Sequence, residues 1–116
     1  MFKGKKVLVL GLAKSGKAAV ELLKFMHADI TINESKKKED IPEYDTYVSE
    51  GIEMVCGGQP DELFERDFDF VVKNPGINYH APFILRLKER GIPVYTEIEL
   101  GYKVAKKQHY IAVTGT

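Results

Sequence analysis

Short apolar runs alternate along the chain with longer stretches in which apolar and charged residues mix. The first run, residues 7–10, holds four apolar residues, two of them β-branched, which is typical of a strand buried on both faces of a parallel sheet. Residues 15–25 carry apolar side chains at helical spacing and predict an amphipathic helix. A strand, a turn and a helix in this order favour the α/β class.

The same alternation continues to the end of the chain. Further strands are predicted at 29–34, 52–56, 68–73, 92–96 and 110–114. Helices are predicted at 44–50, 82–90 and 97–106, with a brief helical turn at 61–64 and a charged loop at 36–42. This order predicts an α/β fold with a Rossmann-like, doubly wound parallel sheet of about five strands and flanking helices. The strand at 110–114 would then be the first strand of a further domain.

A glycine turn joins the first predicted strand to the first predicted helix, and Gly11 and Gly16 bracket it. Free backbone N–H groups and the positive end of the helix dipole suit a phosphate or diphosphate at such a turn. Lys14 lies inside the turn and would add a positive charge unless it points into solvent. Ala13 replaces the second glycine of the G-x-G-x-x-G fingerprint, so a pyrophosphate would stay slightly further from the backbone. The alternative is a turn that binds no ligand.

Two other segments are predicted to reach the same place, because ligands of doubly wound folds bind outside the carboxyl ends of the strands. One is Asn33-Glu34, at the end of the second predicted strand, near the distance from Gly16 at which such folds place a ribose-binding acid. The other is the turn Asn74-Pro75-Gly76 after the fourth predicted strand. The alternatives are that Asn33-Glu34 is only an exposed strand end and that Asn74-Pro75-Gly76 is an ordinary turn, without a ligand at either.

Composition narrows the class of protein. A chain of 116 residues is one domain in size, and its formal net charge of zero argues against a nucleic-acid partner bound through a strong basic field. The single cysteine, Cys56, excludes an internal disulfide and fits a reducing compartment. No signal peptide opens the chain and its apolar runs are too short to span a bilayer. We therefore expect a cytoplasmic protein that needs no membrane.

Catalytic and metal-binding patterns are not found. The three histidines are scattered without ligand spacing, and no Ser/His/Asp order or paired carboxylates occur, so we expect neither a catalytic residue nor a metal site. The last residues, Val113-Thr114-Gly115-Thr116, run from a predicted strand into a glycine turn, as a P-loop does, without the Gly-Lys-Ser/Thr that completes it. This indicates a chain that stops at a domain boundary; a natural end is the alternative.

Five collinear segments together resemble the N-terminal domain of the Mur ligases, especially of the family member that adds D-glutamate: residues 9–16, 74–77, 91–94, 96–100 and 111–116. The resemblance implies a three-domain cytoplasmic enzyme of peptidoglycan synthesis. Such an enzyme uses ATP and Mg²⁺ to join D-glutamate to UDP-N-acetylmuramoyl-L-alanine through an acyl phosphate. Residues 1–107 would form the Rossmann-like domain that binds the UDP substrate, and 108–116 would begin the central ATP-binding domain. The chain alone would bind the UDP end as a monomer, without catalysis.

The resemblance also assigns binding roles to individual residues. The diphosphate would meet the amides of Lys14, Ser15 and Gly16, and the uracil would contact Asn33 or Glu34. The uridine or its phosphate side would contact the turn Asn74, Pro75 and Gly76, and the ATP P-loop would begin with Thr114, Gly115 and Thr116. Family members often have Asp-Thr or Asp-Ser where this chain has Asn33-Glu34, so either residue is a candidate for the uracil contact. On this hypothesis, Gly16→Asp abolishes UDP binding and leaves the fold largely intact.

Two other functions fit the same motifs. The Gly11–Gly16 turn and Glu34 also suit an NAD-binding Rossmann domain of a small dehydrogenase, although Ala13 and the lack of an acid–base pair weaken that interpretation. The second is a nucleotide-sensing regulatory module of a larger transporter or regulator.

Overall fold

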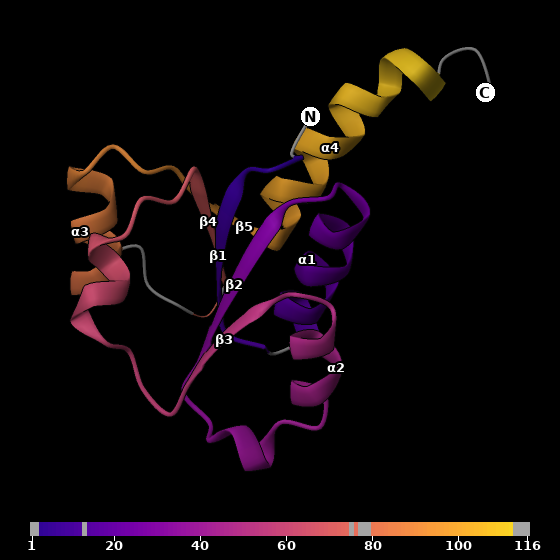
Figure 1. Ribbon diagram of the computed structural model, residues 1–116. Coiled ribbons are helices and arrows are strands. Elements are labelled where there is room, and N and C mark those ends of the chain that lie inside the picture. The colour runs from indigo at the N-terminus through magenta and orange to yellow at the C-terminus, as the bar shows by residue number, and fades with distance from the viewer. Residues whose placement is uncertain (1–2, 13, 75, 77–79, 113–116) are drawn as a thin grey trace.

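The computed structural model describes residues 3–12, 14–74, 76 and 80–112 (Figure 1). Five parallel strands form one sheet in the order β3-β2-β1-β4-β5. The strands are β1 (Lys6–Leu10), β2 (Asp29–Glu34), β3 (Glu53–Cys56), β4 (Phe70–Lys73) and β5 (Val94–Thr96). The strand order reverses at β1, the middle strand, which confirms the doubly wound sheet predicted from the sequence.

Helices cover both faces of the sheet (Figure 1). One face carries α1 (Lys14–Phe25), α2 (Tyr44–Ser49) and α4 (Glu97–Ala112), and the other carries α3 (Pro82–Glu89) and the 3₁₀ helix η2 (Asp61–Glu65). A second 3₁₀ helix, η1 (Lys38–Asp40), lies in the charged loop after β2. The predicted helices and helical turn are all present; their ends shift by one residue, except that α4 runs from Glu97 to Ala112 instead of ending at residue 106.

The apolar run of β1 separates the two cores. Val7 and Val9 pack into the cluster beneath α1 and α4, and Leu8 and Leu10 pack into the cluster beneath α3 and η2. All four side chains are fully buried, which explains why the sequence shows a continuous apolar run instead of an alternating one. In the ladder, Leu10 lies opposite Asn33 on one side and Lys73 on the other. The ends of these three strands are therefore level.

One predicted element is wrong over the residues that the structure describes. The strand expected at 110–114 is helical at 110–112, where α4 continues to Ala112, and 113–114 lie outside the described residues. A helix satisfies its backbone hydrogen bonds within the segment, whereas a strand needs a neighbouring strand. The end of α4 leads away from the sheet (Figure 1), so no described strand lies beside it.

Two strands begin two residues later than predicted, at Phe70 and Val94, and β3 begins one residue later, at Glu53. The predicted strands begin at Phe68 and Ile92, and both side chains are buried in the cluster beneath α3. A buried apolar residue just before a strand continues the apolar pattern of the strand. The sequence pattern therefore extends each predicted strand over these residues.

Candidate functional site

A cleft of about 310 Å³ lies at the carboxyl ends of the strands. Its walls come from the ends of β1 and β2 and from the loops after β2, β3 and β4: Leu10, Gly11, Asn33, Glu34, Ser35, Gln59, Asn74 and Gly76. The cleft therefore brings Gly11, at the start of the glycine turn, together with the other two segments that the sequence predicted to converge. It also contains Ser35 and Gln59, which the sequence analysis missed.

The glycine turn is held in close backbone contact. Gly11 has a φ of +91°, which favours glycine, and its N–H donates to the carbonyl of Asn33 at 2.8 Å. A β-carbon at Gly16 would lie 2.0 Å from the carbonyl oxygen of Gly11, so α1 can approach the strand only with glycine there. The prediction that Gly16→Asp leaves the fold largely intact is therefore wrong, because any side chain at this position collides with the backbone.

The start of α1 presents backbone N–H groups at the cleft end of the sheet. The helix begins at Lys14, so the amides of Lys14, Ser15 and Gly16 have no partner within the helix. The first turn also lacks an acidic residue that would compete for them. These amides and the helix dipole are suited to an anion. Ala13 and the side chains of Lys14 and Ser15 lie outside the described part of the chain.

Glu34 holds the turn in place. Its Oε1 accepts a hydrogen bond from the Leu12 N–H at 2.9 Å, and its Oε2 accepts from the Lys36 N–H at 2.9 Å and the Ser35 hydroxyl at 3.3 Å. Partial burial by itself raises the pKa of this carboxyl, but the hydrogen bonds from Lys36, Leu12 and Ser35 and the charge of Lys36 outweigh it. The pKa of Glu34 is therefore lowered, and the carboxylate is an ionised acceptor.

Asn33 is buried in the wall of the cleft, with 2% of its surface exposed. Its Nδ2 donates to the carbonyls of Val55 at 3.1 Å and Gly58 at 2.7 Å. An amide nitrogen has two hydrogens, so both are used. The side chain thus ties the end of β2 to β3 and to the loop that follows β3.

The turn after β4 lies against the glycine turn. Asn74 Oδ1 accepts a hydrogen bond from the Gly76 N–H at 2.9 Å, and a β-carbon built at Gly11 would lie 3.9 Å from Asn74 Cβ. Lys73, 2% exposed, places its Nζ 3.4 Å from the Asn74 carbonyl oxygen. Pro75 lies outside the described residues, and so do Thr114, Gly115 and Thr116, the expected start of a P-loop.

The two missed residues had a usable signal in the sequence. Gln59 follows the third predicted strand, and the carboxyl ends of parallel strands meet at one edge of a sheet. Ser35 follows Asn33-Glu34 directly, at the end of the second predicted strand.

The pH dependence of stability should reflect Glu34. Because its pKa in the folded state is lowered from the ordinary 4.5, the ionised carboxylate stabilises the fold above pH 4.5, and this stabilisation is lost as the pH falls through the lower folded pKa. We expect Glu34→Gln to reduce the free energy of unfolding by about 1–2 kcal/mol at pH 7. Urea denaturation between pH 7 and pH 3 checks this. An equally steep acid loss in the variant would contradict the assignment.

Two kinds of feature are not found in the described part of the chain. Residues 3–12, 14–74, 76 and 80–112 contain no group of three or more His, Cys, Asp or Glu side chains that could hold a metal ion. Among the same residues, no helix has the length and apolar character needed to cross a membrane.

The parallel sheet with a glycine turn where the strand order reverses defines a Rossmann-like α/β class of domain. Solved structures show the same fold. Scyllo-inositol dehydrogenase from Lactobacillus casei matches with a TM-score of 0.58 and 19% identity, over 92% of this chain and 34% of that protein. Shikimate dehydrogenase from Aquifex aeolicus matches with a TM-score of 0.51 and 15% identity, over 84% of this chain and 44% of that protein.

Within that class, residues 5–96 match the model of the Mur ligase MurD-like N-terminal domain, and the chain belongs to this family. UDP-N-acetylmuramoylalanine–D-glutamate ligase of Streptococcus thermophilus is 48% identical over 114 residues, covering 98% of this chain and 25% of that enzyme. The Streptococcus agalactiae enzyme of the same name is 46% identical over 115 residues, covering 99% and 25%. The chain thus spans about a quarter of the length of these curated relatives. The predicted resemblance is confirmed, and it outweighs the dehydrogenase interpretation.

Proposed function

We propose that this chain is the UDP-binding domain of an ATP-dependent ligase that adds D-glutamate to UDP-N-acetylmuramoyl-L-alanine in the cytoplasm. The observation that carries the proposal is the cleft, because it gathers the glycine turn, the end of β2 and the turn after β4 in a chain of the MurD-like family. The domain would act as a monomer, without a nucleic-acid or membrane partner.

In this proposal the diphosphate lies at the start of α1. The amides of Lys14, Ser15 and Gly16 donate to its oxygens, and the helix dipole adds a favourable field. Glu34 contributes indirectly, because its carboxylate is turned to the Leu12 N–H and keeps the glycine turn in shape. The start of α1 would therefore bind an anion through backbone groups, which suits a diphosphate held close to the chain.

The nucleoside would occupy the remainder of the cleft. Asn33 and Glu34 form its wall at the end of β2, and Asn74 and Gly76 of the turn after β4 form the opposite wall. The exposed backbone of Gly76 leaves room for close approach of the uridine or its phosphate side.

The chemical step would take place in the rest of the ligase. ATP transfers its γ-phosphoryl group to the alanyl carboxylate, which gives an acyl phosphate and ADP; the amine of D-glutamate then attacks the carbonyl, an amide bond forms and phosphate leaves. Thr114, Gly115 and Thr116 would begin the ATP site, and the Mg²⁺ that accompanies ATP would bind there.

Amide NMR titration of the 13.1 kDa chain tests the proposal with UDP, UDP-N-acetylmuramoyl-L-alanine and NAD in parallel. We expect the two UDP ligands to shift the amide resonances of residues 14–16, 33, 34, 74 and 76, because these residues lie at the start of α1 or line the cleft, and NAD to leave them unchanged. Equal shifts with NAD would support the dehydrogenase or sensor interpretation. If neither UDP ligand shifts any of these resonances, the proposal for this chain is contradicted.

A further inference from the structure

Helix α4 has apolar side chains on two opposite faces. Leu100 and Val104 pack into the core cluster beneath α1 and α4, with 0% and 4% of their surfaces exposed. Ile98 and Tyr102 are each offset from this pair by two residues, and two residues turn a helix by about 200°, so they lie on the opposite face. They are 72% and 71% exposed, the highest values among the large apolar residues that the structure describes.

We call Ile98 and Tyr102 the outer patch of α4. The two residues are four positions apart, so their side chains are neighbours on the helix surface and form one apolar area. The tyrosine adds an aromatic ring with a polar tip, a side chain that is enriched at interfaces between proteins and domains. A helix that faces water ordinarily carries polar residues on its outer side, whereas a helix that is apolar on opposite sides is typical of a position between two packed layers.

The outer patch is held in a fixed position by the start of α4. The Thr96 hydroxyl oxygen accepts a hydrogen bond from the Glu99 N–H at 3.2 Å, and the Glu99 Oε1 accepts one from the Thr96 N–H at 3.0 Å. This reciprocal pair is a capping box, and Ile98 lies inside the turn that it closes. A patch that is already ordered costs less conformational entropy when it is covered.

The family relationship indicates what covers the outer patch. The match to the N-terminal domain of the family ends at residue 96, directly before α4 begins at Glu97. The similarity to the Streptococcus thermophilus ligase covers 98% of this chain, so it includes α4, but it covers only 25% of that enzyme. Helix α4 is thus shared with complete ligases and lies outside their N-terminal domain model, as expected of an element that contacts two domains.

We propose that the outer patch of α4 is a docking surface for an apolar face of the part of the ligase that this chain does not contain. Leu100 and Val104 attach the helix to the Rossmann-like sheet, and Ile98 and Tyr102 attach it to the neighbouring domain. This inference rests on the proposed function, because it takes the chain as one domain of a longer ligase. The domain boundary is then a surface along α4, not the point at residue 107 that the sequence predicted.

Thiol labelling measures whether the outer patch is covered. In a Cys56→Ser background, Ile98→Cys and Tyr102→Cys each place one reporter thiol on the patch. Both should react rapidly with a maleimide in this 116-residue chain and about tenfold more slowly in the intact ligase, where the patch reacts only when the domains separate. Leu85→Cys is the matched control, since Leu85 is an exposed apolar residue of α3, on the other face of the sheet. Its rate should be the same in both proteins.

A second measurement needs no cysteine. Tyr102→Ser changes an exposed side chain of similar helix propensity, so the Tm of the 116-residue chain should stay within about 1 °C of the wild type. In the intact ligase the same change removes a covered aromatic ring and should lower the Tm by about 3 °C. Equal Tm changes in the two proteins would overturn the proposal.

The labelling outcomes also identify other occupants. Equal rates for Ile98→Cys and Tyr102→Cys in the chain and in the intact ligase would overturn the proposal, as would equal slowing of Leu85→Cys, which indicates general shielding. A rate that falls as the concentration of the 116-residue chain rises would assign the patch to a second copy instead. Binding of UDP-N-acetylmuramoyl-L-alanine by the intact ligase is measured separately: its absence contradicts the proposed function, while slow labelling at 98 and 102 would still support the docking surface.

Discussion

Gly16→Ala should destabilise the chain by about 3 kcal/mol, at the upper end of what an overpacked side chain costs. The reason is geometric: the new β-carbon would lie 2.0 Å from the Gly11 carbonyl oxygen and 3.0 Å from its carbon. These are backbone atoms of the turn after the central strand, so they cannot rotate away. Thermal denaturation should show a fall in Tm of about 10 °C.

Gly101→Ala in α4 is the matched control, because a β-carbon there meets no atom within 4 Å. In a helix interior, this exchange stabilises by about 1 kcal/mol, so its Tm should rise. If both variants lose stability equally, the close approach of α1 to the glycine turn is not what requires glycine at position 16.

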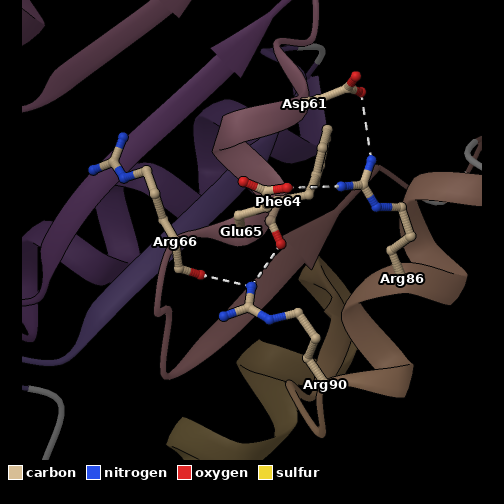
Figure 2. Close-up of polar contacts among 6 residues, drawn as sticks. All are labelled: Asp61, Phe64, Glu65, Arg66, Arg86 and Arg90. Atoms are coloured by element: carbon tan, nitrogen blue, oxygen red, sulfur yellow. Dashed lines mark hydrogen bonds and ion pairs between the residues drawn. The ribbon is translucent and has the colours of Figure 1, made fainter.

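Arg90→Ala should cost about 2–3 kcal/mol in the free energy of unfolding. Arg90 donates to the carbonyls of Phe64 and Arg66 and to the carboxylate of Asp67, at 2.9 Å in the last two cases (Figure 2 shows the carbonyl contacts). Truncation leaves the carbonyls next to the buried Phe64 ring without their charged donor, and such bonds contribute more than neutral ones. Urea denaturation at pH 7 measures the loss.

Arg86→Ala provides the comparison from the same helix. Its guanidinium pairs with Asp61 at 3.4 Å and Glu65 at 3.8 Å, and both carboxylates are largely exposed. Exposed ion pairs contribute at most about 1 kcal/mol, so this variant should remain near wild type. A larger loss for Arg86→Ala than for Arg90→Ala would contradict the view that carbonyl capping fastens η2 to α3.

The sheet could be predicted because its signals are local. The run at 7–10 is apolar throughout since β1 is buried on both faces, and 29–34 matches β2 to the residue. The strand predicted at 110–114 shows the limit of local patterns. A short run of apolar residues fits a strand or a helix equally well when no neighbouring strand is known, and here α4 extends through Ala112.

The location of the cleft was also predictable, because the ends of parallel strands coincide. What each side chain does there was not. Asn33 and Glu34 were expected to face a ligand, yet their polar atoms bond to Gly58, Leu12 and neighbouring backbone groups. The pairings of Asn33 with Gly58 and of Glu34 with Leu12 join residues more than twenty positions apart, and they depend on distances that a linear pattern does not contain. Gly16 was recognised as part of the turn, but the contact with Gly11 that requires glycine is likewise visible only in three dimensions.

The central place of β1 also determines when the domain can be completed during synthesis. β1 pairs with β2 on one side, but its other neighbour is β4, whose residues 70–73 emerge from the ribosome only after α2, β3 and η2. Until then one edge of β1 has no strand beside it, and an open edge is a site for wrong pairing. The turn after β4 is missing from the cleft for the same interval, so the cleft has both walls only once the two halves of the sheet have joined.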